Sequence, residues 1–427
     1  MSSNKLFFLV ICLIIFSGLL FAANDWTDQN PANPPAIRRD HSMSYIAEGK
    51  VILFGGYSNN VFYNDTWIYD VIDNTWILQN PMISPPARQF SAIAYAGENK
   101  VMMYSGELED YSELPDTWIY DLSDNEWTEV SAALSPLPLS MHAMAYIGEN
   151  KVLLFGGQYS NDETWVFDAS NNWWYQVSAT PHPSGRWYHS MSYIGEDKVM
   201  LFGGNAGGTD MNDTWIYDLS DNTWTEMSPA NAPCSRATQE SGYLCDDKVV
   251  LFGGCTWPTN WNDTWIYDLS ENNWTQDENN IVPETRFRHT FCESSMSGTA
   301  YPVLFGGMNE TTELNDTWTF GGGDFLGTDP ANIPDPGFVL HQNYPNPFNP
   351  STTISFKINN TQNEQIELEI YNLKGQRIKQ FSIFNFQPSI TWNGTDQSNQ
   401  PVSSGLYFYS LQINGEPVQT RKMLLMK

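Results

Sequence analysis

The sequence predicts an all-β protein in which a six-bladed β-propeller, closed by an N-terminal outer strand, precedes a small β-sandwich. Three observations predict this fold: a repeat of about fifty residues, two tryptophans in each repeat, and a change of composition near residue 333. Short strands at a fixed period are typical of propellers, because each four-stranded unit must stack on its neighbours to bury its faces.

Two short motifs define the repeat. An aromatic residue with Gly-Gly precedes an Asp-Thr-Trp unit, and a second Trp lies six residues beyond the acid that closes the next strand. The first motif begins at Phe54, Phe155, Phe202, Phe252 and Phe305, with a degenerate copy at Tyr104, and the second begins at Asp65, Asp116, Asp213, Asp263 and Asp316, with Glu163 as a variant. We therefore count six copies, each expected to form four strands joined by turns rich in Gly, Asn and Asp.

The sixth copy lacks its fourth strand. After Trp318 the chain continues into Gly321, whereas the segment around Trp26 resembles the fourth-strand segment around Trp224. We therefore expect the N-terminal segment to complete the sixth copy and to close a propeller that spans residues 24–320.

The net charge is concentrated in the propeller. The 427 residues include 49 acidic and 20 basic side chains, a net charge of -29, whereas residues 334–427 hold 6 acidic and 7 basic side chains. A nucleic-acid partner is excluded, because phosphates require a basic surface. An aromatic content of 14% argues against disorder, and five cysteines are too few for a disulfide scaffold.

Residues 1–23 have the pattern of a secretory signal peptide. Lys5 precedes an apolar run that ends at small residues, Ala22 and Ala23. An uncleaved membrane anchor is the alternative, because residues 6–23 carry no charge and approach the roughly 20 residues of a spanning helix. In both cases the rest of the chain leaves the cytoplasm, and we expect membrane contact only through this segment. A linker over 321–337 then separates the propeller from residues 338–427.

Arginines gather in the connections from the fourth strand of one copy to the first strand of the next. One interpretation is that they fix these connections by hydrogen bonds to backbone carbonyls. The alternative is a ring of guanidinium groups at the channel mouth, suited to carboxylate or sulfate groups and interrupted by Leu139 in the third copy. Five of the arginines are repeat-equivalent: Arg38, Arg88, Arg186, Arg236 and Arg286.

Aromatic side chains in the same connections, and in the variable loops after Gly-Gly, complete the candidate binding face. They suit stacking on sugar rings or contact with a protein, and packing between adjacent loops is the alternative. With the five arginines, the candidate ligand-binding residues are Trp187, Tyr111, Trp257 and Trp261.

The sequence carries no catalytic motif. Metalloprotease, nucleophile-elbow and phosphate-loop patterns are absent from it, so we expect no catalytic residue, no metal and no cofactor. Four histidines share one repeat position and are interpreted as structural: His41, His142, His189 and His289. In the fifth copy the first two strands are antiparallel, which brings Cys234 and Cys255 to one end and predicts a disulfide between them. Cys245 and Cys292 are expected to stay reduced.

The Gly-Gly motif, its aromatic neighbour and the Trp after an acidic turn resemble the kelch repeat over residues 24–323. The pattern departs from that repeat at Ser105 and in the incomplete sixth copy. The resemblance implies a binding platform, which most kelch propellers are. A minority are carbohydrate-acting enzymes, such as galactose oxidase and the sialic-acid mutarotase group.

The C-terminal segment resembles the sorting domains of type IX secretion cargo. The motifs that carry this resemblance are 340–352, 370–375, 392–394, 402–407 and 421–427, and the later ones are also similar to the Ig-like domain of the flagellar hook-capping protein. The resemblance implies passage through the outer membrane by the type IX machinery, followed by release or attachment at the cell surface. An adhesion-type Ig-like domain that stays on the protein is the alternative.

Together these patterns favour a secreted or cell-surface recognition module, expected to be monomeric, that binds a surface glycan or a protein. The alternative from another class is a carbohydrate-active enzyme, similar to a mutarotase, epimerase or oxidase, that uses the channel mouth. A structural component of the cell envelope is a third interpretation.

Overall fold

The computed structural model describes residues 25–321, apart from 246, 279–280 and 295–300, and residues 338–426, apart from 341–347, 359–365, 373, 384–388 and 414–415. The chain forms two compact units, Met1–Leu326 and Gly327–Lys427. The predicted signal segment and nearly all of the predicted linker lie outside the described residues. Among the residues described, the only helical element is the short 3-10 turn η1 (Gln158–Ser160), and no helix there is long and apolar enough to cross a membrane.

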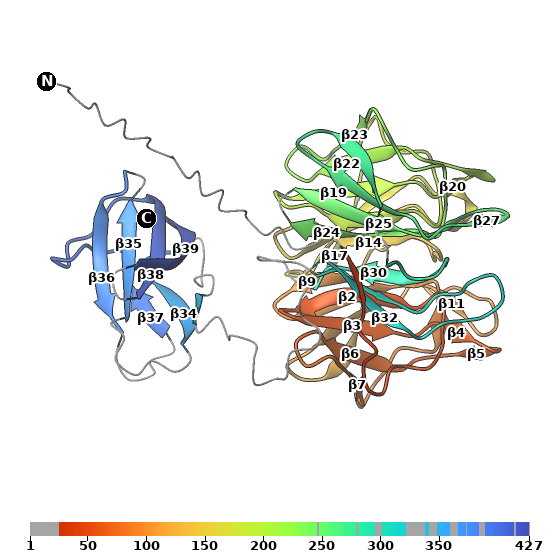
Figure 1. The fold of residues 1–427 in the computed structure, drawn as a ribbon, viewed down its shortest axis with the longest axis horizontal. Helices are drawn as coiled ribbons and strands as arrows, with labels where there is room; N and C mark the ends of the chain where they lie inside the picture. Colours follow the sequence, from red (N-terminus) through yellow and green to blue (C-terminus); the bar gives the residue numbers. More distant parts are fainter. Residues whose placement is uncertain are drawn as a thin grey trace, which may run out of the picture. The chain divides into compact units, whose positions relative to one another are not determined.

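The first unit contains six four-stranded antiparallel sheets, which we call blades one to six (Figure 1). In order from the first strand to the outer strand, blade one is β2 (Ser42–Ala47), β3 (Lys50–Phe54), β6 (Thr66–Asp70) and β7 (Thr75–Gln79), and blade two is β9 (Ala92–Gly97), β10 (Lys100–Tyr104), β12 (Thr117–Asp121) and β13 (Glu126–Val130). Blade three is β14 (Ala143–Tyr146), β15 (Lys151–Phe155), β16 (Thr164–Asp168) and β17 (Trp173–Val177), and blade four is β18 (Ser190–Tyr193), β19 (Lys198–Phe202), β22 (Thr214–Asp218) and β23 (Thr223–Met227). Blade five is β24 (Glu240–Cys245), β25 (Lys248–Phe252), β28 (Thr264–Asp268) and β29 (Asn273–Asp277), and blade six is β30 (Thr290–Cys292), β31 (Val303–Phe305), β32 (Thr317–Phe320) and β1 (Trp26–Asp28).

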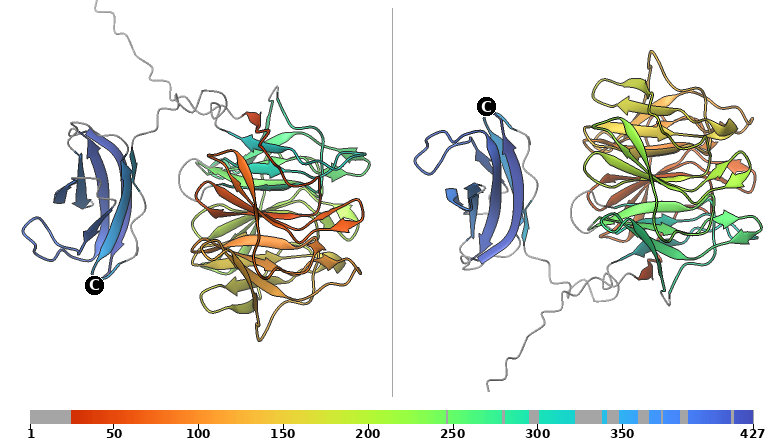
Figure 2. Two further views of the ribbon diagram at one scale, coloured as in Figure 1. Left: turned by 90° about the horizontal axis from the view of Figure 1, so that it is seen from below. Right: turned by 90° about the horizontal axis from the view of Figure 1, so that it is seen from above.

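Short hairpins extend three of the loops after Gly-Gly, and in blade two the corresponding loop strand pairs with a strand of the connection that precedes the blade. They are β4 (Tyr57–Ser58) with β5 (Val61–Phe62), β8 (Arg88–Gln89) with β11 (Glu107–Leu108), β20 (Asn205–Ala206) with β21 (Thr209–Asp210), and β26 (Cys255–Thr256) with β27 (Thr259–Asn260). Figure 2 shows the blades from two further sides.

The N-terminal strand completes blade six, as the sequence predicts. Trp26 pairs with Phe320 and Asp28 pairs with Trp318, so β1 forms the outer strand of a sheet whose other strands lie almost 300 residues later in the chain. The strand that the sixth copy lacks is therefore supplied by residues 26–28.

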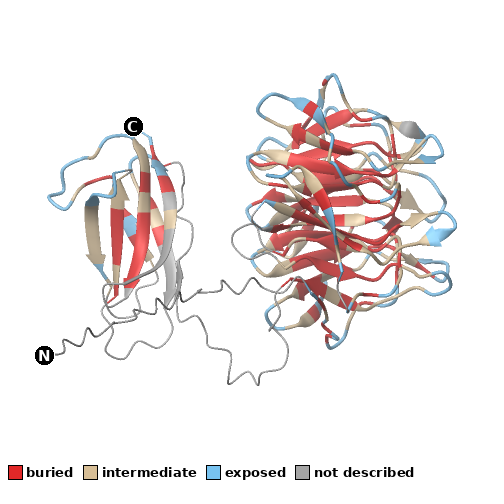
Figure 3. Cartoon of the chain, turned by 45° about the horizontal axis from the view of Figure 1, so that its top comes forward, coloured by how far each residue is buried: buried red, intermediate tan, exposed pale blue. Residues whose placement is uncertain are grey.

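Each outer-strand tryptophan links its blade to the preceding one. The indole of Trp224 is buried and its Nε1 donates to Thr164 Oγ1 at 3.0 Å. The five equivalent bonds join Trp26 to Thr264, Trp76 to Thr317, Trp127 to Thr66, Trp174 to Thr117 and Trp274 to Thr214. Figure 3 shows the buried residues concentrated in the strands and the exposed ones in the loops. The threonine of Asp-Thr-Trp thus satisfies a buried indole N–H that would otherwise be costly to bury.

The Gly-Gly pair is required where second strands end. Gly55 and Gly56 both have positive φ, and a Cβ on either would lie within 2.9 Å of neighbouring atoms, the Arg88 carbonyl and the His41 Cβ. Any side chain would collide there, so the close approach between adjacent blades demands glycine.

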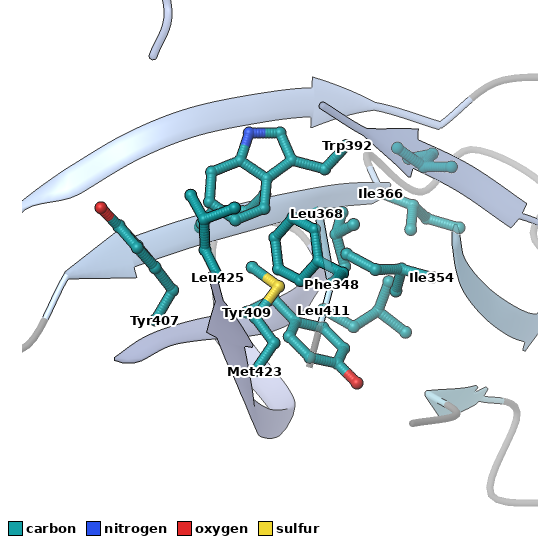
Figure 4. Packing of buried hydrophobic residues seen from close by; sticks show 12 residues of the cluster. Phe348, Ile354, Ile366, Leu368, Trp392, Tyr407, Tyr409, Leu411, Met423 and Leu425 are labelled. Carbon is teal, nitrogen blue, oxygen red and sulfur yellow. The ribbon is translucent and has the colours of Figure 1, made fainter. Parts of the chain in front are cut away.

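The second unit is a two-sheet β structure. One sheet contains β33 (Phe338–Leu340), β34 (Thr352–Ile358) and β37 (Ser389–Trp392), and the other contains β35 (Ile366–Asn372), β36 (Arg377–Ser382), β38 (Gly405–Ile413) and β39 (Glu416–Leu425). Figure 4 shows its core, in which Trp392 lies close to Phe348 and Tyr407. The Trp392 indole Nε1 donates to the Thr395 carbonyl at 2.8 Å.

Candidate binding site at the channel mouth

The five repeat-equivalent arginines, which we call the anchor arginines, are buried and bind aspartates within the blades. The side chain of Arg186 is fully buried, and its Nη1 and Nη2 donate to the two carboxylate oxygens of Asp213 at 2.6 and 2.8 Å. The same Nη1 also donates to the Gly203 carbonyl at 2.9 Å. The equivalent pairs are Arg38 with Asp65, Arg88 with Asp116, Arg236 with Asp263 and Arg286 with Asp316. Such bidentate geometry is the strongest form of a charged hydrogen bond.

This geometry corrects one sequence-based hypothesis. The anchor arginines are not a ring of free guanidinium groups at the channel mouth, because each one is turned into its own blade against an aspartate. The acid of Asp-Thr-Trp is the partner that sequence reasoning missed. The sequence of blade three supports this arginine–aspartate pairing, because Leu139 replaces the arginine in the same copy in which Glu163 replaces the aspartate. Burial acts to raise the pKa of Asp213, but the hydrogen bonds and charge of Arg186 outweigh it, and the pKa is lowered.

Two residues beyond the anchor position, the chain forms a ring that we call the mouth ring. Its six members are chemically different, and all have positive φ between 57° and 60°. Their backbones form a closed cycle of hydrogen bonds from each N–H to the carbonyl of the preceding blade, at 2.9–3.4 Å. The members are Asp40, Phe90, Met141, Tyr188, Thr238 and Arg288. Left-handed geometry is unfavourable for residues other than glycine and is concentrated at functional sites.

Arg288 and Asp40 form an ion pair within the mouth ring. Arg288 Nη1 lies 3.3 Å from Asp40 Oδ2, which also accepts from Arg39 Nη1 at 2.9 Å. The Arg288 guanidinium carbon lies 5.5 Å from the ring centroids of both Phe90 and Tyr188, so this side chain contacts members of blades one, two and four. Burial raises the pKa of Asp40, and the charges of Arg288 and Arg39 oppose that rise. Unlike the anchor arginines, Arg288 keeps a partly exposed guanidinium with a single bond to a carboxylate.

A small cavity of about 80 Å³ lies beneath the mouth ring and is lined by all six of its members. Glu240 also lines this cavity, at a position where the other five blades carry Ser, Ala or Thr. Burial raises the pKa of Glu240 to about 8. A neutral carboxylic acid therefore lies under the guanidinium-bearing mouth near neutral pH.

The channel continues as a cavity of about 120 Å³ lined by first strands of all six blades. Near its other end five repeat-equivalent tyrosines form a collar in which consecutive rings of Tyr45, Tyr95, Tyr146 and Tyr193 lie 4.9–5.1 Å apart, edge to face. Tyr243 is the fifth, and Glu293 takes the sixth position. Burial raises the pKa of Glu293. Both channel acids are departures from the repeat, which an alignment of the six copies could have found.

Comparison with known proteins agrees with this geometry. The family model described as the KLHDC2/KLHL20/DRC7 Kelch-repeats domain matches residues 16–157 and 141–322, which together span well over half of the chain. The chain belongs to the kelch-repeat family. The solved structure of YjhT is similar over 66% of this chain and 95% of YjhT, with a TM-score of 0.53 and 13% identity, a likeness that shows the fold alone. No curated protein matches the chain.

The second unit has its own match. Residues 342–426 match the family described as the secretion system C-terminal sorting domain. This match confirms the predicted sorting domain and implies secretion or export to the cell surface through the type IX machinery.

The histidines of the kelch propeller contact neighbouring blades. A Cβ on Gly156 of blade three would lie 2.7 Å from His189 Cε1, so the His189 imidazole is directed at that blade. Gln239, at the same repeat position in blade five, donates to the Phe202 carbonyl at 2.9 Å. Burial lowers the pKa of His142 to about 3 and also lowers the pKa of His189 well below its ordinary value, which keeps both imidazoles neutral. No cluster of three or more metal-ligating side chains occurs in the described part of the chain.

The predicted aromatic residues separate into two groups. Trp257 and Tyr111 are 87% and 76% exposed on loops after Gly-Gly, where a ligand can reach them. Trp261 instead lies against the anchor Arg236, with its ring centroid 5.2 Å from the guanidinium carbon. Trp187 is half-buried and pairs through its backbone with Asn205. The structure thus brings Trp187 next to the mouth ring and assigns Trp261 a packing role.

The predicted disulfide is not formed in the structure. Cys234 and Cys255 are both free, as is the buried Cys292. The register explains the error: Cys255 pairs with Ala237, three residues beyond Cys234, and its Sγ lies 3.4 Å from Thr238 Oγ1. The side chain of Cys245 lies outside the described residues.

Proposed function

We propose that the protein is a recognition module, secreted or displayed at the cell surface, whose kelch propeller binds a glycan or a protein ligand at the mouth ring. One observation carries the proposal. Six repeat-equivalent positions hold six chemically different side chains in left-handed geometry, two residues beyond a position at which five of the six copies carry the same arginine. Variation on a rigid, strained backbone ring is the pattern expected of a specificity surface.

The dimensions of the channel favour recognition from outside. Pockets that enclose a small-molecule ligand typically measure about 300–1,000 Å³, whereas the cavity beneath the mouth ring measures about 80 Å³. A ligand would therefore rest on the mouth, with the Arg288 guanidinium as a hydrogen-bond donor and the exposed Trp257 as a stacking surface at the rim.

A carbohydrate-active enzyme is the second candidate, and Glu240 is the observation that favours it. A carboxylic acid with a pKa of about 8 in the same small cavity as Arg288 has the properties of a general acid. In this case opening of the mouth ring would admit the reacting group to Glu240. Glu240→Gln would then abolish turnover without weakening ligand binding.

An array of glycans and polysaccharides tests the proposed binding face. We expect Arg288→Ala and Trp257→Ala each to weaken the strongest signals at least tenfold. Trp173→Ala is the matched control, because Trp173 is equally an exposed indole but lies on the outer strand β17. Signals that are indifferent to both mouth variants would contradict the proposed site.

Export can be tested separately. Deletion of residues 338–427 should retain the propeller in the periplasm, because the sorting domain would be missing. A propeller that still reaches the medium or the cell surface after this deletion would contradict a role for residues 338–427 in sorting.

A further inference from the structure

The interface between blades two and three is packed differently from the interfaces beside it. At three other interfaces, an isoleucine near the end of the first strand belongs to the same hydrophobic cluster as a leucine of the following blade. The pairs are Ile46 with Leu122, Ile147 with Leu219, and Ile194 with Leu269. Between blades two and three the same two positions hold Ala96 and Ala169. Two branched side chains that fill the other three interfaces are therefore missing from this one.

A groove of about 550 Å³ lies at these two alanines and is lined by residues of both blades. Ala96 and Ala169 line it together with Ile119 and Val130, which gives the groove an aliphatic floor. Its volume falls within the range of about 300–1,000 Å³ that is typical of ligand pockets, whereas the cavities at the mouth and in the channel measure about 80 and 120 Å³. Interiors of proteins are closely packed, so a groove of this size between two blades is a candidate binding site.

Carboxylates form the rim of this groove at one end of blade two. Lys100 pairs through its backbone with Asp121, and Asp121 pairs with Glu126, so these three lining residues form a row across the sheet. Lys100 also forms an ion pair with Asp121 at 3.3 Å. Glu98 and Asp124 stand in the two turns beside this row, both exposed, and neither forms an ion pair with another described residue. The rim therefore has two carboxylates that are available to a cation.

The aliphatic floor and the acidic rim together indicate the chemistry of the ligand. The net charge of -29 attracts a basic partner and repels an acidic one. An inorganic cation would make no use of the floor, and a sugar would find no ring to stack on, because none of the described residues that line the groove is aromatic. A lysine or arginine side chain fits both parts, since its aliphatic stem packs on apolar surface while its charge stays in water. Carboxylates in two separate turns accommodate two such side chains from one segment.

We propose that the groove between blades two and three binds an extended basic segment of a partner protein. The aliphatic stems of its lysine or arginine side chains lie over Ala96 and Ala169, and their charges lie at Glu98 and Asp124. The rim is at the opposite end of the strands of blade two from Phe90 of the mouth ring, so this site is separate from the proposed binding face.

Fluorescence anisotropy tests this proposal with the full chain and a dye-labelled peptide, Gly-Lys-Gly-Lys-Gly, whose two lysines lie on one side when it is extended. Protein is titrated over about 1 µM–1 mM at physiological salt. The unaltered chain should bind this peptide about tenfold or more tightly than the neutral peptide Gly-Gln-Gly-Gln-Gly. Ala169→Leu restores the leucine of blades two, four and five, so the fold should be retained while affinity falls about tenfold or more. The matched control is Val71→Leu, which places the same residue at the same position of blade one and should leave the affinity unchanged.

The acidic rim has its own pair of matched variants. Glu98→Gln/Asp124→Asn should weaken binding of the lysine peptide about tenfold or more. Glu196→Gln/Asp221→Asn removes the same charges from the same two turns of blade four and should have no such effect. Both variants change the net charge equally, so a general attraction to the acidic propeller would weaken binding in both alike.

Further measurements keep the result decisive. If Ala169→Leu unfolds at a lower temperature than Val71→Leu, Ala96→Ile fills the groove from its other wall and should weaken binding to the same extent. Cadaverine, a free diamine, should displace the peptide only at concentrations about tenfold or more above those of unlabelled peptide; equal potency would overturn the proposal in favour of a small amine. Absence of peptide binding, equal effects within either matched pair, or loss of binding in Arg288→Ala, which would place the peptide at the mouth, would also overturn it.

Discussion

The anchor arginines and the mouth ring lie two residues apart in the same connections, yet they have opposite properties. At the anchor position five blades repeat one solution, a fully buried arginine bound to the aspartate of Asp-Thr-Trp. At the mouth position six blades carry six different residues on a common backbone geometry. Repetition at the anchor position shows that it holds each blade together, and diversity two residues later is the basis of our proposal that the mouth ring contacts a ligand.

Replacing an anchor arginine should have the largest effect. Arg186→Ala leaves Asp213 largely buried without its cation, so we expect a loss of about 3–5 kcal/mol in the free energy of unfolding, measured by denaturant titration. Arg288→Ala removes a partly exposed partner while Arg39 still binds Asp40, so its loss should be about 1 kcal/mol. Equal losses of unfolding free energy in Arg186→Ala and Arg288→Ala would contradict the distinction between the anchor position and the mouth ring.

The pH dependence of stability should differ between Glu240, the acid in the channel, and the aspartates that bind the anchor arginines. The pKa of Glu240 is raised by burial to about 8 in the folded protein, well above the unfolded value of about 4.3. The contribution of Glu240 to the free energy of unfolding is therefore fully present below about pH 4 and is lost as the pH rises through 8. We expect the free energy of unfolding to decrease by about 2–3 kcal/mol, because partial hydration of the channel reduces the effect. Glu240→Gln should remove this decrease.

Denaturant titrations from pH 5 to pH 9 measure the effect, with Glu226→Gln on an exposed outer strand as the control. A Glu240→Gln protein with the same pH profile as the unaltered chain would show that the acid is not buried at the channel. The anchors should behave in the opposite direction. The pKa of Asp316 is lowered because Arg286 outweighs burial, so that contribution is present at neutral pH and is lost as the pH falls through the carboxyl range.

The smallest expected effect concerns the tyrosine collar. Glu293→Tyr supplies the residue that five blades already carry and removes a carboxyl group whose pKa is raised by burial. We expect an increase of about 1 kcal/mol in the free energy of unfolding, the range of an aromatic pair, measured by thermal unfolding at neutral pH. A decrease would mean that the collar requires an acid at this position.

The sequence alone predicted those features that depend on local spacing. The six copies, the completing strand at Trp26 and the sorting domain follow from motifs that repeat or match as short strings. The aspartate partner of Arg186 was missed because the two residues lie 27 positions apart and meet only when the blade folds. The cysteine prediction failed because register, which brings Ala237 opposite Cys255, is not visible in a strand assignment.

The candidate site was predicted less well than the fold. The candidates chosen from the sequence lie in the same connections as the mouth ring, but they include the arginines that recur and leave out Asp40 and Glu240, which do not recur. A positive φ at a non-glycine residue leaves no local signal, so the mouth ring could not be recognised from composition or spacing. Glu240 and Glu293 could have been identified from the sequence, because each is an acid where the other five copies carry Ser, Ala or Thr, or Tyr, respectively.

The strand β1 also determines how the propeller responds to mechanical force. The three-residue strand Trp26–Asp28, together with hydrogen bonds of Asp25 and Gln29, holds the start of the described chain to blade six, and a pull from this end would load this short segment before any other. Its release would expose the edge of β32 and remove the Trp26 indole from Thr264 of blade five. Resistance of the ring to pulling from this end is therefore set by one short strand, the hydrogen bonds of Asp25 and Gln29 beside it, and one buried tryptophan.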